Sequence, residues 1–518
     1  MVSTRRSTLV AVGGLIASVV AYPQTENVVT YEANSTTADT CTSFKASFPG
    51  MTILPSENDY RDLNEFSWSR EGWLGPACIL TPSCAEELSS AVKTLVERKT
   101  PFAIRGGGHM PIGDAANINS TGVLIASSKM RLKELSEDLQ TLTVGVGSPW
   151  GEVYEYLDTT KTGKMVVGGR YAPVGIPGYM LGGGISFYSY EYGMSAANGN
   201  VRSYECVLAD GSIAKATADN EFSDLFWALQ GGGNSFCLLT KIELRTIDSP
   251  VISMAGPKWG GYAFKEQFLQ STINYVTTGD RDLKSAFVPL VRWGQNFTEP
   301  SYEGNMWYNG NVTKPEVFTD YQGGILPENN STVLRQSTMG QFAASLKPFY
   351  VRGGESAGKM QLFHVVSHAA TITAMRVVHD TFLDGIQKHN LKEVDRFFSS
   401  IAYNTVTPTF AKLSQGMPQG IPQEAAFWSE QAVSWVKPED GPRIRAFIDD
   451  VNANITAQLE ASGELRTYLY LNDAELSQPV FQGYPPENLA RLKEIRAKYD
   501  PNRVYTDQMP GGFKVEHA

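Results

Sequence analysis

The sequence predicts an α+β fold in two lobes, and three observations support this prediction. The chain has 518 residues, more than one hydrophobic core usually serves, so we expect two domains. Up to about residue 250, short apolar runs alternate with amphipathic ones, as strands and helices do in a sheet-based domain. After residue 250 the chain contains more aromatic residues and longer helical stretches. This change favours a second domain, built on an antiparallel sheet with helices on one side.

The expected elements of the first lobe follow one another closely. Short apolar runs indicate strands, and apolar residues at i, i+3 and i+4 indicate helices. The turn at 209–211 (Ala-Asp-Gly) is typical of a hairpin. We expect strands at 77–82, 101–107, 123–127, 142–147, 201–213 and 236–247, and helices at 85–97 and 150–157, in one mixed sheet with a loop-rich ligand face.

The second lobe and the tail are organised around longer helices. Helical spacing predicts helices over 369–388 and 442–459, and a third over 487–499 that Asp500-Pro501 closes. We expect this last helix to return to the first lobe. The resulting division is 1–21 for a signal peptide, 22–71 for an N-terminal segment, 72–250 for the first domain, 251–455 for the second, and 456–518 for the returning segment.

The N-terminal residues have the pattern of a secretory signal peptide. Arg5 and Arg6 precede an apolar run from Leu9 to Ala21 that is too short to span a bilayer comfortably, and cleavage is expected before Tyr22. The alternative is a single N-terminal anchor. Sequons for N-glycosylation agree with passage through the secretory pathway, and they lie at Asn34, Asn119, Asn296, Asn311, Asn329, Asn330 and Asn454. We therefore expect a secreted protein without a membrane partner.

Charge and cysteine usage narrow the classes further. The net charge of −10 argues against nucleic acid or an anionic membrane as a partner. Five cysteines leave at least one unpaired, and we favour a bridge from Cys41 to Cys78 or Cys84. No two cysteines form a CxxC pair, so we expect no metal site.

Three glycine clusters are the main sign of a ligand. They lie at Gly106–Gly108, at Gly175, Gly178 and Gly182–Gly184, and at Gly231–Gly233. Glycines in series let backbone N–H groups close around an anion, because no Cβ blocks the approach. Tight turns alone would explain one cluster, but three favour an extended phosphate-bearing ligand. His109 directly follows the first cluster and is placed to react with that ligand.

Other motifs in the chain are weaker. The run 145–151 (GVGSPWG) lacks both the GxGxxG spacing and the acidic residue of a nicotinamide-binding fold, so we interpret it as a structural turn. His364 and His368 stand four apart in a strand-like run without a third ligand, which favours core or pocket-lining histidines over a metal site. Neither GxSxG nor HExxH occurs, so hydrolase machinery is absent from the sequence.

Several blocks occur in an order that is typical of one family. They are RGGGHMP at 105–111, PVGIPGYMLGGGISFYSYEYGMSA at 173–196, LADGS at 208–212, DLFWALQGGGNSF at 224–236, YLYLND at 468–473 and KYDPNRVY at 498–505. Together they resemble the FAD-linked oxidases of the berberine-bridge-enzyme type, within the vanillyl-alcohol-oxidase superfamily. The resemblance extends from about Cys41 to the end of the sequence and implies a PCMH-type FAD-binding domain, a substrate domain and bound FAD.

The resemblance implies roles for individual residues. In the family the histidine after the glycines bonds to the flavin 8α-methyl carbon, and His109 has that position. Tyr171 stands where many relatives have a second, cysteine attachment, so we expect FAD bound covalently through His109 alone. Val174 matches the residue that oxygen-reactive members use. The expected cofactor site is Arg105, Gly106, Gly107, Gly108, His109, Met110, Val174, Gly175, Gly178, Gly182, Gly183 and Ile242.

On the substrate side, the family's YxN motif matches Tyr470 and Asn472, and with Tyr171 these are the expected catalytic residues. A tyrosine over the flavin relays a proton while hydride leaves the substrate. The alternative for Tyr470 is an aromatic residue in a buried strand. The sequence does not identify a further acid or base.

We therefore expect a secreted, monomeric oxidase that removes two electrons from a small organic molecule and returns them to O₂ as H₂O₂. A secondary metabolite is the first choice of substrate and an oligosaccharide the second. The rival functions are a non-redox cyclase or isomerase on the same scaffold, and a flavin-bearing protein without turnover.

Overall fold

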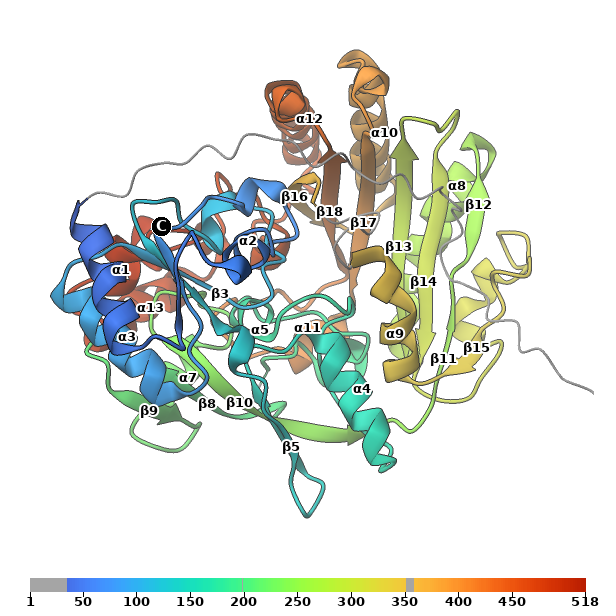
Figure 1. Cartoon of the computed structure of the whole chain (residues 1–518). Coiled ribbons are helices and arrows are strands. Elements are labelled where there is room, and N and C mark those ends of the chain that lie inside the picture. The colour runs from blue at the N-terminus through green and yellow to red at the C-terminus, as the bar shows by residue number, and fades with distance from the viewer. Residues whose placement is uncertain (1–34, 198, 351–357) are drawn as a thin grey trace, which may run out of the picture.

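A computed structural model describes residues 35–197, 199–350 and 358–518. The expected signal peptide and the sequon at Asn34 lie outside these residues. The described chain forms three sheets, two within residues 52–248 and one within residues 252–435. The predicted α+β class is confirmed, with an antiparallel sheet in the second lobe. Figure 1 shows this third sheet standing beside the helices and smaller sheets of the first lobe.

The first lobe contains two sheets where the sequence predicted one mixed sheet. In the first, β2, β4 and β3 are parallel, and β1 is antiparallel to β2. In the second, all neighbours are antiparallel. The prediction of a single mixed sheet was wrong because, among the described residues, no strand of β1–β4 pairs with a strand of β5–β10, so the two groups form separate sheets. The crossover through α3 makes β2 and β3 parallel members of one sheet, whereas short turns make β5 and β6, and β8 and β9, antiparallel neighbours in the other. The strand orders are β1 (Thr52–Ile53), β2 (Cys78–Leu80), β4 (Val123–Ala126), β3 (Phe102–Arg105), and β5 (Lys133–Leu135), β6 (Thr141–Gly145), β10 (Leu238–Asp248), β8 (Val201–Val207), β9 (Ile213–Ala216), with β7 (Lys164–Val166) also on β10.

Helix α3 illustrates how the sequence forms the first lobe. Its residues Leu88, Ala91, Val92 and Leu95 recur at helical spacing and are buried, and two glutamates in its first turn complement the helix dipole. Eight helices belong to this lobe: α1 (Ser35–Ser47), α2 (Asn58–Asn64), α3 (Ala85–Glu97), α4 (Trp150–Thr160), α5 (Ile176–Leu181), α6 (Ser189–Tyr192), α7 (Ser223–Ala228) and α13 (Pro486–Tyr499).

The second lobe is an eight-stranded antiparallel sheet with helices on one face. Buried residues of the sheet, such as Ile401 and Val433, share one hydrophobic core with α8, α10 and α12. The opposite face turns towards the first lobe, and α9 lies beside α4 there (Figure 1). The strand order is β15 (Arg335–Ser337), β11 (Ile252–Ala255), β14 (Ser301–Tyr308), β13 (Ser285–Gly294), β17 (Phe398–Val406), β18 (Ala426–Trp435), β16 (Met360–Ala369), with β12 (Lys258–Gly260) on β14. The helices are α8 (Lys265–Thr278), α9 (Met339–Tyr350), α10 (Ile372–Lys388), α11 (Pro408–Leu413) and α12 (Gly441–Ala461).

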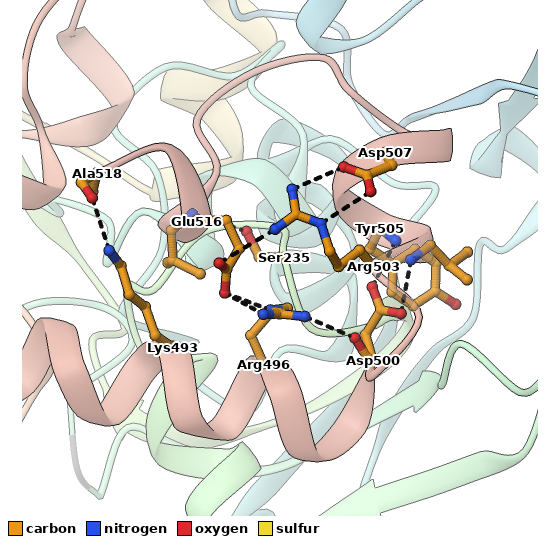
Figure 2. Close-up of polar contacts among 11 residues, drawn as sticks. Ser235, Lys493, Arg496, Asp500, Arg503, Tyr505, Asp507, Glu516 and Ala518 are labelled. Carbon is orange, nitrogen blue, oxygen red and sulfur yellow. Dashed lines mark hydrogen bonds and ion pairs between the residues drawn. The ribbon is translucent and has the colours of Figure 1, made fainter.

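The tail after α13 is tied to the first lobe by polar contacts. Arg496 pairs with Glu516, and the buried carboxylate of Asp500 accepts the backbone N–H groups of Val504 and Tyr505 at 2.8 and 2.7 Å (Figure 2). The Tyr505 hydroxyl donates to the Val207 carbonyl in β8 at 2.9 Å. The tail therefore closes on the sheet that carries β8.

Two disulfides cross-link the described part of the first lobe. Cys41 is joined to Cys78, one of the two pairings that the sequence favoured, and Cys84 is unpaired and exposed. The sequence did not predict the second bridge, between Cys206 in β8 and Cys237. This pair is 31 residues apart in the chain and meets only because β8 and β10 pair in the folded sheet.

Candidate active site

A large cavity lies between the two lobes. Its volume is about 2130 Å³, above the usual range of roughly 300–1,000 Å³ for a small-ligand site. One wall is formed by the glycine turns of the first lobe. The other is formed by alternate residues of β13, β16, β17 and β18, among them Leu290, Phe363, Ala402 and Glu430. The cavity has room for a dinucleotide together with a second molecule.

Two of the glycine turns touch backbone to backbone. A Cβ on Gly107 would lie 2.3 Å from the Gly175 nitrogen, and one on Gly175 would lie 2.2 Å from the Gly107 nitrogen. Any other residue at either position would push the turns apart. Gly178 lines the cavity and has nothing within 4 Å of its missing Cβ. These turns present bare backbone to the cavity, which is the geometry that an anion-binding turn requires.

His109 lies on the cavity wall between two aromatic rings. Its imidazole stacks on Trp68 with ring centres 4.4 Å apart and planes inclined by 16°, and the Tyr171 ring lies 5.5 Å away. Burial lowers the pKa of His109 to about 4. The imidazole is therefore neutral at neutral pH and has a free electron pair, as a nucleophile requires.

Most of the site residues predicted from the sequence meet at this cavity. They are Gly106, Gly107, Gly108, His109, Met110, Tyr171, Val174, Gly175, Gly178, Tyr470 and Asn472.

Four predicted residues support the walls instead of lining the cavity. The buried Arg105 donates to the Leu63 carbonyl, and its guanidinium lies over the Phe66 ring. A Cβ on Gly182 would lie 2.1 Å from Asn472 Oδ1, and Gly183 lies close against Gln419 and Met194. Ile242 is buried in β10 between β6 and β8. The contacts of these four residues are therefore packing contacts within the protein, and none of the four lines the cavity.

Tyr470 and Asn472 are hydrogen-bonded to each other and to the second glycine block. The Tyr470 hydroxyl accepts from Asn472 Nδ2 at 2.9 Å and from the Ile185 N–H at 3.1 Å, and Asn472 also donates to the Tyr179 carbonyl. The alternative of a buried strand is wrong, because Leu471–Asp473 is a 3-10 turn. Burial outweighs the two donors and raises the pKa of Tyr470 well above its usual range, so the phenol is protonated at neutral pH.

Glu430 is a candidate acid or base that the sequence did not identify. It lies on β18, and its side chain lines the cavity. Burial, and then the charge of Asp473, raise the pKa of Glu430 well above its usual range, while Arg170 acts in the opposite direction. A perturbed carboxyl in a cavity is typical of a catalytic group. Strand alternation could have indicated its face, but not what lies opposite it.

Arg170 and Asp473 also line the cavity near Glu430, and Asn404, which does not line it, links the two by hydrogen bonds. Arg170 donates to Asn404 Oδ1 at 2.7 Å, and Asn404 Nδ2 donates to Asp473 Oδ2 at 2.8 Å. Burial raises the pKa of Asp473 to about 7. Arg170 and Asn404 are 234 residues apart in the chain, so no local motif links them.

The histidine pair in β16 belongs to the sheet. His368 is buried and hydrogen-bonded through its two ring nitrogens to the Ala369 carbonyl and to Ser429. Neither His364 nor His368 lines the cavity. Across residues 35–197, 199–350 and 358–518, no three His, Cys, Asp or Glu side chains gather as a metal site would require.

Known proteins resemble this chain over nearly its whole length. Residues 76–217 match the family described as an FAD binding domain. An FAD-dependent monooxygenase of Penicillium roqueforti is 30% identical over 508 residues, covering 92% of this chain and 94% of its own. The bifunctional solanapyrone synthase of Alternaria solani is 29% identical over 481 residues, covering 92% and 88%. The solved structure of berberine bridge enzyme superposes with a TM-score of 0.73 at 17% identity, covering 90% and 98%.

The fold and the cavity together define an FAD-dependent oxidoreductase. The backbone-lined turns and the neutral histidine fit a flavin dinucleotide, and the opposite wall supplies acid–base groups. More narrowly, the chain belongs to the same family as the FAD-dependent monooxygenase of Penicillium roqueforti, and its fold is that of berberine bridge enzyme.

Proposed function

We propose that the protein is a secreted oxidase that carries FAD on His109 alone and oxidises a small organic molecule at the expense of O₂. The observation that carries this proposal is that the glycine turns, His109 and Tyr470 line the same cavity as Glu430, which lies on the sheet of the second lobe. Bound FAD would supply the hydride acceptor and pass two electrons to O₂, which yields H₂O₂.

Residues of the chain would accept the proton that the substrate loses. A substrate that loses hydride from carbon must also lose a proton from the attached O–H or N–H group. Glu430 in its carboxylate form is the acceptor, because it is the buried carboxyl on β18 that faces the cavity. Tyr470 is held by the Ile185 N–H and Asn472 and would orient the departing O–H or N–H group through its own hydroxyl proton.

The surroundings of Glu430 favour a largely apolar substrate. Leu290, Phe363 and Ala402 line the sheet face beside Glu430, as expected for a polyketide- or alkaloid-like secondary metabolite. The polar residues that line the cavity at other points of the same strands are Arg292, Gln361, Ser400 and Ser434. The solanapyrone synthase that resembles this chain is named for such a product. A carbohydrate would be expected to meet more hydrogen-bonding groups at this position.

Secretion is proposed from two features, the exposed sequons and the disulfides. The sequons at Asn119, Asn296, Asn311, Asn329, Asn330 and Asn454 all lie at exposed positions. Two disulfides are typical of an oxidising compartment. Among the described helices, none has both the length and the apolar character that a membrane crossing requires.

The chemistry is tested by screening metabolites for H₂O₂ release and for anaerobic bleaching of the flavin. An oxidase is expected to release H₂O₂ in air and to show bleaching of the flavin without oxygen. Because relatives are named monooxygenases, the product is also analysed after turnover under ¹⁸O₂. Label in the product would overturn the oxidase proposal, and bleaching without H₂O₂ in air would indicate a dehydrogenase. Product formation without bleaching would indicate a cyclase or isomerase.

The covalent attachment is tested by mass spectrometry of acid-denatured protein. Flavin on the peptide that contains His109, and its release from His109→Ala, are the expected results. Quantitative release from the unaltered protein would contradict the attachment.

A further inference from the structure

Two buried carboxyls share one guanidinium on the substrate side of the cavity. Glu430 on β18 and Asp473 at the end of the Tyr470 turn both line the cavity, and Arg170 lies in the wall with them. The negative charge of Asp473 raises the pKa of Glu430, and the positive charge of Arg170 lowers the pKa of both acids. One positive charge cannot balance two ionised carboxylates at such a site, so the pair favours retention of one proton.

The hydrogen bonds decide which carboxyl keeps that proton. A guanidinium can only donate, so the Asn404 oxygen must face Arg170 and the Asn404 Nδ2 must face Asp473. The Asp473 oxygen is therefore an acceptor, which favours its ionised form. In the described part of the chain, no donor to the Glu430 carboxyl is found, and this carboxyl faces the cavity.

The remaining titratable groups around Arg170 do not compete for the proton. The charge of Arg170 also acts on Tyr179 of α5, Tyr190 of α6 and Tyr470. Burial raises the pKa of each of these phenols, so all three are protonated at neutral pH. The titration near neutral pH therefore belongs to Glu430 and Asp473.

We propose that Asp473, held by Arg170 through Asn404, is a positioning residue that keeps a single shared proton on Glu430 in the resting site. This inference rests on the proposed role of Glu430 as the proton acceptor. Asp473 carries the charge, and Glu430 becomes competent only when it releases its proton to solvent through the cavity. Glu430 then takes the proton of the substrate O–H or N–H group as hydride leaves the carbon.

Variants that remove one charge at a time test this arrangement, with the rate of anaerobic flavin reduction measured against pH in the holoenzyme. Asp473→Asn removes the negative charge beside Glu430, so the acid limb of the profile should move to lower pH by about 1–3 units. Arg170→Gln removes the opposing positive charge, so the limb should move to higher pH. The control is Asp219→Asn, a substitution at an exposed position in the first lobe, and it should leave the acid limb of the pH profile in place.

A second measurement does not depend on turnover. Infrared difference titration of the full-length protein follows the C=O band of a protonated carboxyl, and Glu430→Gln identifies the band by removing it. In the unaltered protein the band should persist at neutral pH, and in Asp473→Asn its midpoint should fall. This titration remains informative if no substrate is ever oxidised, so failure of the oxidase proposal is distinguishable from failure of this one.

Three outcomes would overturn the inference. They are a Glu430 that is already ionised at neutral pH, an Asp473→Asn profile that does not move, and shifts of the same sign in the two charge variants. If Asp473→Asn does not fold, Arg170→Gln and the infrared band of the unaltered protein still decide the question.

Discussion

The indole of Trp68 stacks on the imidazole of His109, with ring centres 4.4 Å apart and planes inclined by 16°. The backbone N–H of Trp68 donates to the Gly108 carbonyl at 2.9 Å, so the residue that carries the indole is tied to the turn that precedes the histidine. This contact keeps the imidazole in one orientation. Such an orientation would favour the single attachment point that we propose for the flavin.

Removing the indole should therefore impair attachment of the flavin. We expect Trp68→Ala to lower the fraction of flavin that stays bound after denaturation several-fold, and Trp68→Phe to retain most of it, because a phenyl ring can still stack. Flavin fluorescence in denaturing gels, normalised to total flavin, provides the measurement. Undiminished attachment in Trp68→Ala would show that the stacking is incidental.

The family resemblance predicts that Tyr171 stands where many relatives have a second attachment, and its ring lies 5.5 Å from that of His109. We expect Tyr171→Cys to provide a new tether, since a thiolate is a stronger nucleophile than a phenol. The test combines it with His109→Ala: the double variant should keep flavin on the cysteine peptide in mass spectrometry. The double variant His109→Ala with Tyr171→Phe is the control and should lose its flavin on denaturation. Equal loss of flavin from the two double variants would contradict the placement of Tyr171 beside the flavin.

The hydroxyl of Tyr470 should contribute to the chemical step. Tyr470→Phe removes a group that two N–H donors hold at the cavity, so we expect the rate of flavin reduction to fall by roughly 10²–10⁴-fold. Tyr468→Phe is a matched control two residues away, because the buried Tyr468 hydroxyl has no hydrogen-bond partner in the described structure. Similar rates in the two variants, at equal flavin content, would argue against the role of Tyr470.

The bridge between Cys206 and Cys237 should matter for stability. It closes a loop with a sequence separation of 31 residues, and loop-closure entropy assigns about 4 kcal/mol to such a link. Replacing both cysteines by alanine should lower the free energy of unfolding by about that amount, measured in denaturant. Cys84→Ala should change it by less than about 0.5 kcal/mol, because Cys84 is exposed and unpaired. Equal effects would mean that the bridge does not constrain the unfolded chain.

Sequence reasoning succeeded where the signal is local. Helix α3 was predicted over the residues it occupies, because four buried residues at helical spacing define it within 13 residues. The sequence located the glycine turns and His109 at the cavity for the same reason, since consecutive residues define them. The ends of longer helices were less accurate: α10 begins at Ile372, three residues after the predicted start. The Thr371 side chain caps this helix.

By itself the sequence determined the α+β class and located the glycine turns, His109 and the Tyr470–Asn472 motif. Only the tertiary structure decided that the first lobe has two sheets, that Cys206 meets Cys237, and that Arg170, Glu430 and Asp473 line one cavity, with Asn404 hydrogen-bonded to two of them. The physical reason is that these contacts join residues far apart in the chain. A polar residue in a strand shows no sign of its partner until sheet register and lobe packing place the two together, and the charge environment that makes Glu430 reactive exists only after that assembly.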